Sequence, residues 1–176
     1  MIMRLLDLID ALNDTVGKLV SFIIWFGIAV LCFEVVARYA FDQPTIWAHG
    51  YTQRLFGSYF ALIGAYTLVR HEHVRVDIFL TEHRSRRKAI LDLINYAFLI
   101  VWGSVLTLEG WAFFLAAWKW CEVDDSVLGH PMWPPKLALF VGSLLITLQG
   151  VSEALRSILM FVSPATHPME AAQDDA

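Results

Sequence analysis

Hydrophobic positions along the chain gather in four stretches without a charged residue, at 19–33, 55–69, 93–108 and 137–152. Each stretch is shorter than the roughly 20 residues that a membrane-spanning helix needs. Extended to the nearest polar or proline residues, the stretches become helices at about 16–39, 46–69, 90–118 and 135–160. None alternates with the period of two that marks a barrel strand. The pattern therefore predicts an all-α membrane protein with four transmembrane helices.

Positive charge predicts how these helices are oriented. The short loop between the second and third predicted helices holds six of the thirteen basic residues: Arg70, Arg75, Arg84, Arg86, Arg87 and Lys88. Basic loops of this length stay in the cytoplasm. The other two loops carry acidic residues, so we expect them outside and both termini inside. Four tryptophans fall at the expected outer boundary, where indole rings settle: Trp47, Trp118, Trp120 and Trp133.

The two ends of the chain differ from the predicted spans. In residues 1–14 the apolar side chains form one helical stripe and the polar ones lie mostly opposite, which is typical of an amphipathic helix in the membrane interface. Residues 164–176 are polar and hold two prolines, which predicts a disordered cytoplasmic tail. We therefore expect one membrane domain over residues 1–163.

The composition and the missing motifs exclude several classes of function. Hydrophobic residues make up 57% of the chain and charged residues 17%, and the net charge of −4 argues against nucleic-acid binding. The two cysteines, Cys32 and Cys121, form neither a disulfide framework nor a zinc knuckle. Motifs for a nucleophile, a phosphate loop or a zinc protease are missing from the sequence. We therefore expect neither an enzyme nor a bound cofactor.

Several ionisable residues fall inside the predicted spans, where an unpaired charge is costly. Glu34 and Arg38 are one helical turn apart, and Arg54 and Glu109 lie at a similar depth below the outer surface. Depth alone predicts a neutral cluster of these four side chains. Such a cluster serves either as an ion or proton path, or as a polar contact within the protein or with a partner subunit.

Other charged positions are weaker candidates. Glu153 and Arg156, three residues apart near the inner end of the fourth helix, are expected to form an interfacial pair. His71 and His73, followed by Asp77 and His83, resemble a metal site by composition, but an exposed basic loop does not supply converging ligands. A haem held by two histidines needs both inside the spans, and only His49 approaches one.

Motifs around the first two predicted helices resemble a known family. They are EVVARYAF at 34–41, PTIW at 44–47, Arg54, the pair Gly64 and Ala65, and HVRVD at 73–77. In this order and spacing they are similar to the small membrane subunit, DctQ-like, of tripartite ATP-independent periplasmic (TRAP) transporters. One departure is clear, because the acidic residues that usually follow the tryptophan are replaced here by Ala48, His49 and Gly50.

The resemblance implies a bacterial inner-membrane scaffold. In such systems a periplasmic binding protein delivers an organic acid or related solute to a large, sodium-coupled, DctM-like membrane subunit, which the small subunit supports in the lipid bilayer. By this resemblance Glu34, Arg38, Arg54, Arg75 and Asp77 are structural or inter-subunit residues. Because the missing acid leaves Arg54 without its usual neighbour, Glu109 or Glu34 is the expected replacement.

Two other functions remain open from the residues alone. One is the membrane anchor of a respiratory complex, which explains a small four-helix chain but has to work here without haem. The other is a small dimeric exporter with Glu34 as its proton carrier. The sequence does not identify the transported solute.

Overall fold

The computed structural model describes residues 2–70 and 86–162. These ranges contain four helices, α1 (Ile2–Ala40), α2 (Ala48–Val69), α3 (Arg86–Lys119) and α4 (Trp133–Val162). The prediction of an all-helical chain with four helices is thereby confirmed. Apart from the start of α1, the helix ends lie within about four residues of the predicted ones.

Three of the helices, α1, α3 and α4, are long and apolar enough to cross a membrane. At 1.5 Å per residue, the 22 residues of α2 reach about 33 Å, which also matches a lipid bilayer. Its first two turns, however, carry His49, Gln53 and Arg54, which lower its apolar character. A membrane crossing by α2 therefore stays a prediction.

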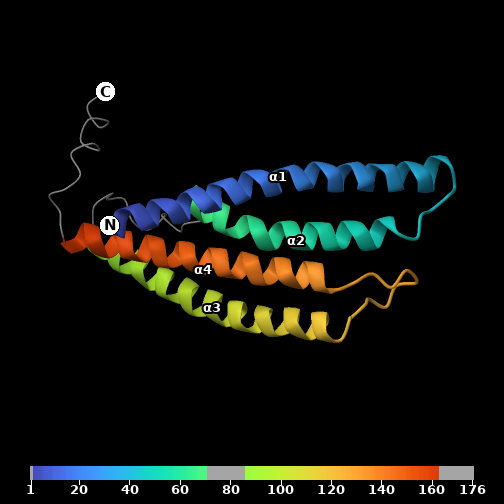
Figure 1. Cartoon of the computed structure of the whole chain (residues 1–176). Helices are drawn as coiled ribbons and strands as arrows, with labels where there is room; N and C mark the ends of the chain where they lie inside the picture. The colour runs from blue at the N-terminus through green and yellow to red at the C-terminus, as the bar shows by residue number, and fades with distance from the viewer. Residues whose placement is uncertain (1, 71–85, 163–176) are drawn as a thin grey trace, which may run out of the picture.

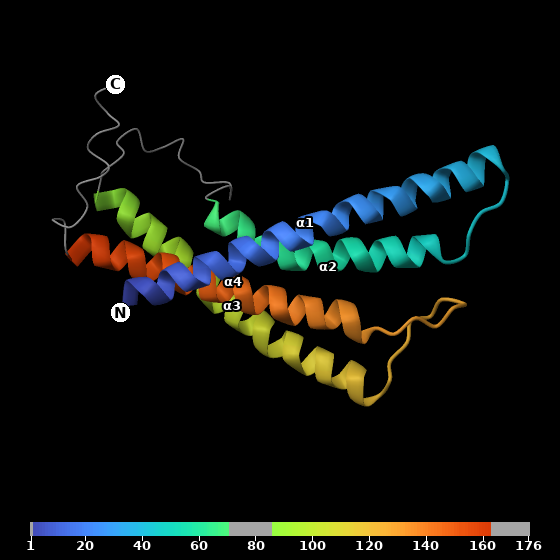
Figure 2. The same ribbon diagram turned by 45° about the horizontal axis from the view of Figure 1, so that its top comes forward.

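The helices stand in a row rather than in a closed bundle (Figure 1). Along the row α1 packs on α2, α2 on α4, and α4 on α3, and α1 also reaches α4 near its own N-terminus. Within the described residues α3 packs on α4 alone. Figure 2 shows the α1–α2 and α3–α4 pairs spreading apart toward the end that holds segments 41–47 and 120–132, called here the hairpin end.

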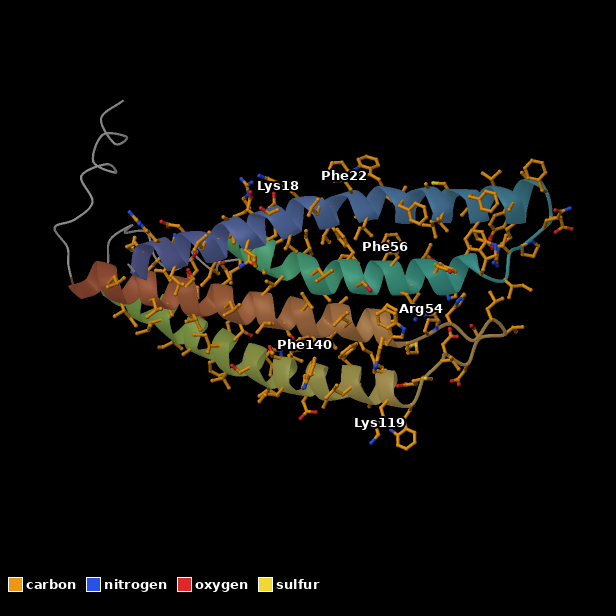
Figure 3. The ribbon with its side chains drawn as sticks, viewed as in Figure 1. Lys18, Phe22, Arg54, Phe56, Lys119 and Phe140 are labelled. Atoms are coloured by element: carbon orange, nitrogen blue, oxygen red, sulfur yellow. The ribbon has the colours of Figure 1, made fainter. Side chains whose placement is uncertain are left out.

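Small residues bring the helices of the row into close contact. A side chain at Gly142 of α4 would overlap the backbone carbonyl of Ala61 in α2. Gly103 of α3 lies against Thr147 of α4, and Gly110, seven residues later, lies against Phe140. Phe56 and Phe140 lie between helices, whereas Phe22 points away from the row (Figure 3). Because the contacts are narrow, most large apolar side chains are left on the outside.

The N-terminal segment differs from the expectation of a separate interfacial helix. It continues without a break into the first span, so α1 is one helix of 39 residues. The reason lies in its polar side chains: Asn13 is almost fully buried and bonds to Gln149 of α4, and Asp10 contacts α4 as well. These contacts hold the segment against the row. The predicted tail and the basic loop, with Arg75, Asp77 and the histidines at 71, 73 and 83, lie outside the described residues.

Candidate functional site

Glu34 organises the corner between α1 and α2. Its carboxylate is buried, and one oxygen accepts hydrogen bonds from Arg38 Nη2 at 2.6 Å and Arg38 Nε at 3.1 Å. The other oxygen accepts bonds from the backbone N–H and the hydroxyl of Thr45. Asp42, with φ of 52°, turns the chain between the two helices. Glu34 therefore ties α1 to the segment that leads into α2, and its charge is balanced by Arg38.

Arg54 is neutralised by Asp124, a residue of the segment between α3 and α4. The pair joins Arg54 Nη2 to Asp124 Oδ2, and both side chains are about four-fifths buried. The second oxygen of Asp124 accepts bonds from Ser126 Oγ at 2.7 Å and from the backbone N–H of His130 at 2.9 Å. His130 in turn packs edge-on against Tyr51 of α2, with ring centroids 4.8 Å apart. The hairpin end of α2 is thus fixed to segment 120–132.

The predicted four-residue cluster does not form. Glu34 and Arg38 pair with each other and Arg54 pairs with Asp124, while Glu109 lies exposed on α3. The prediction was wrong because depth gives a residue's height along a helix and not the direction in which its side chain points. Asp124 was not among the predicted partners of Arg54, because the acidic residues of the outer loop had served only to orient the helices; the signal was the uncompensated Arg54 beside a loop rich in acidic residues.

A buried polar network joins α1 to α4 at the end opposite the hairpin end. Asn13 Nδ2 donates to Gln149 Oε1 at 2.7 Å, and both residues are 1% exposed or less. Gln149 Nε2 then donates to Asp10 at 2.9 Å and to Glu153 at 3.3 Å. The side-chain amide of Gln149 therefore connects Asn13 and Asp10 of α1 with Glu153 of α4.

Arg156 supplies the positive charge of this network. Its Nη2 lies 2.5 Å from Asp10 and 3.3 Å from Asp7. The expected pair between Glu153 and Arg156 is therefore wrong, because Arg156 turns toward α1 while Glu153 accepts its bond from Gln149.

A second contact at the same end involves Arg70, just after α2. Its guanidinium lies 2.8 Å from Asp14 of α1, which also pairs with Lys18 at 2.5 Å. Electrostatic attraction to the Tyr66 side chain, and then the hydrogen bond and charge of Asp14, raise the pKa of Arg70 above its ordinary value. The pair adds a link between α1 and the end of α2.

The described residues hold no group of three or more histidine, cysteine or acidic side chains that could bind a metal ion. A groove of about 470 Å³ runs between α1 and α2 near the hairpin end. Its lining is aromatic, aliphatic or small, with one hydroxyl: Phe26, Gly27, Val30, Trp47, Tyr51, Thr52 and Leu55. Apart from Glu109, the charged residues described above thus form contacts within and between helices and connecting segments, and none of them lines this groove.

Comparison with known proteins agrees with the motifs. Residues 27–160 match the family model described as tripartite ATP-independent periplasmic transporters, DctQ component. The chain is also 27% identical, over 96 residues, to the C4-dicarboxylate TRAP transporter small permease protein DctQ of Vibrio cholerae. That alignment covers 52% of this chain and 41% of the relative, so it spans less than half of the relative's length.

Proposed function

We propose that this chain, which belongs to the DctQ family of TRAP transporter components, is the small membrane subunit that supports a large transport subunit in the bacterial inner membrane. A DctQ component is a transport subunit and not an enzyme. The role we propose for this chain is mechanical: it holds and widens the membrane-embedded part of the transporter.

The observation that supports a scaffold most directly is how the charged side chains are used. Arg54 binds Asp124 and so joins α2 to segment 120–132, and Arg156 binds Asp10 and so joins α4 to α1. Arg38 binds Glu34 one turn away within α1. A transport path instead needs polar groups around an enclosed, hydrated cavity. Among the described residues the helices form an open row, and its larger groove carries no charge. A smaller pocket of about 240 Å³ is lined by Glu34 and Arg38, whose charges balance each other.

The remaining parts of the transporter follow from family membership as proposals. A periplasmic binding protein delivers the solute, and a large DctM-like subunit couples its import to sodium. The solute class is an organic acid or a related compound; the Vibrio cholerae relative is named for C4-dicarboxylates. We place both termini and the basic loop in the cytoplasm, where the loop also faces lipid headgroups. In this arrangement Glu34, Arg38, Arg54, Arg75 and Asp77 act as structural or inter-subunit residues.

Purification of the tagged chain from its native membrane in a mild detergent tests the proposal. We expect a polytopic subunit of many spans to co-purify in a fixed ratio, and solute uptake by the cells to be lost when either gene is deleted. A flavin or iron–sulfur partner would point to a respiratory anchor. Recovery as a lone dimer with intact proton-coupled export would point to a small exporter, and either result would contradict the scaffold.

A further inference from the structure

Helix α3 stands at the edge of the row and leaves much of its surface uncovered, including one long face that carries Glu109. The face consists of residues spaced alternately by four and three, all exposed: Phe98, Trp102, Val105, Glu109, Ala112 and Ala116. This spacing follows one side of a helix over five turns. We call it the Glu109 face. The residues that pack toward α4, such as Gly103 and Gly110, point about 100° away from it.

Glu109 gives this face a charge that no described residue of the chain balances. It lies ten residues before the end of α3, about 15 Å along the helix and close to the middle of its apolar span, Leu93–Lys119. No hydrogen bond or ion pair joins its side chain to any other residue in 2–70 and 86–162. A carboxylate at that depth is costly in lipid, so such residues face protein or water and have a partner.

The described residues of a second copy of this chain do not supply the partner cation. The cations of α1 and α2 near the hairpin end, Arg38 and Arg54, are already bound to carboxylates. Lys119 lies at the end of α3 against the Trp120 ring. Two copies meeting symmetrically through the Glu109 face would also bring two carboxylates together. The charge therefore calls for a cation from a different protein.

The shape of the face fits a helix better than a lipid chain. Ala112 and Ala116 are one turn apart and follow directly after Glu109, which lets another helix backbone come close beside the carboxylate. Trp102 and Phe98, each about two-thirds or more exposed, offer a large apolar contact on the other side of it. A small-residue step next to an unpaired acid is the arrangement that polar helix contacts in membranes use.

We propose that the Glu109 face is the docking surface for a membrane helix of the large subunit, and that this helix carries an arginine or lysine at the depth of Glu109. The proposal rests on the scaffold function proposed above and adds the face and the charge that make the contact. In this proposal Glu109 forms an ion pair with the large subunit, and not with Arg54 as the predicted four-residue cluster required.

Photo-cross-linking in native membranes tests the face. Cys32 and Cys121 are first replaced by serine, and a single cysteine is placed by Ala116→Cys or by Leu115→Cys, then labelled with benzophenone maleimide. Residues 115 and 116 lie at nearly the same depth in the membrane, but their side chains point about 100° apart around the helix axis. We expect Ala116→Cys to cross-link strongly to the polytopic subunit and Leu115→Cys to do so much more weakly. Equal cross-linking at both positions, or adducts of Ala116→Cys with lipid or a second copy alone, would overturn the proposal.

Charge substitution tests the ion pair. Glu109→Gln should lower the amount of co-purified large subunit about three- to tenfold, and Glu109→Lys should lower it further. The matched control Asp125→Asn, an exposed loop carboxylate, should change nothing. Because Glu109 has no partner within the described chain, Glu109→Gln should leave the melting temperature of the isolated subunit unchanged.

The outcomes separate the two proposals. If the unmodified chain neither co-purifies with nor cross-links to a polytopic subunit, the scaffold function fails and the docking surface with it. If the complex forms but Glu109→Gln and Glu109→Lys both retain it fully, only the docking surface is wrong. A fall in the isolated subunit's own stability would assign Glu109 an internal role and would also overturn the docking surface.

Discussion

Arg54 and Asp124 form the ion pair that fixes α2 to segment 120–132, and both are largely buried. Removing one partner leaves the other charge buried without compensation. We expect Arg54→Gln to lower the free energy of unfolding by about 1–3 kcal/mol, a range below that of fully buried pairs because both side chains retain some exposure. Denaturant titration of the purified chain, followed by circular dichroism, measures the change.

A double-mutant cycle identifies the partner of Arg54. Asp124→Asn should destabilise the chain by a similar amount, and the double variant should cost less than the sum of the two single ones. Asp125→Asn, in the same segment but exposed, should stay within about 0.5 kcal/mol of the original. Additive effects of Arg54→Gln and Asp124→Asn would show that the two side chains do not interact.

Gln149 is the residue on which the contact between α1 and α4 depends most, since its amide bonds to Asn13, Asp10 and Glu153. Gln149→Leu keeps a similar volume but leaves the Asn13 amide buried without a partner. We expect a loss of about 1–3 kcal/mol in the free energy of unfolding. Asn13→Leu combined with Gln149→Leu should recover part of that loss, because neither buried amide then remains unpaired. A double variant less stable than both single ones would contradict this account.

At the scale of the helices, close packing of α2 on α4 depends on Gly142. Its missing side chain makes room for the backbone carbonyl of Ala61, which cannot move aside as a flexible side chain can. We expect Gly142→Ala to destabilise the chain by about 1–3 kcal/mol through overpacking. Gly57→Ala is the matched control, because that position on α2 faces open space, and it should be neutral or stabilising by up to about 1 kcal/mol. Equal effects of both substitutions would show that α2 and α4 are not in this close contact.

The helices themselves could be predicted because runs without charge are a property of the sequence alone. The ends of α2, α3 and α4 follow from the polar residues and prolines that border those runs. The start of α1 could not be predicted, since Asp10 and Asn13 look solvent-facing until Gln149 and Arg156 of α4 are known to lie beside them.

The sequence also did not show how each helix is rotated about its own axis. A side chain's depth follows from counting residues, but its direction depends on which helix packs where. Glu109 and Arg54 share a depth, yet in the part of the chain that the structure describes α3 packs on α4 alone, so Glu109 points away from α2. The missing acid after Trp47 did indicate that Arg54 needed a distant partner; the fold of segment 120–132 decided that it is Asp124.

At the scale of the whole molecule, an open row leaves most of its apolar surface for lipid or for a partner, in contrast to a closed bundle that buries its own centre. Phe22 and Trp25 of α1, and Phe98 of α3, are each more than two-thirds exposed. Such a flat shape has little core of its own, so its stability in the membrane depends on what covers both sides of the row. This agrees with a subunit that works as part of a larger assembly.

Orientation of the row can be measured with the chain's own cysteines. Cys121 is exposed in the segment after α3, and Cys32 lies within α1 in its apolar span. If the hairpin end faces the periplasm, a membrane-impermeant maleimide should label Cys121 in intact spheroplasts, and Cys121→Ser should abolish that label, because Cys32 is shielded by lipid. Arg4→Cys, made in the Cys121→Ser background, should react only after the membrane is permeabilised, since it lies at the opposite end of α1. Labelling of Arg4→Cys but not of Cys121 in intact spheroplasts would reverse the orientation and place the basic loop outside, against the charge rule that predicts it inside.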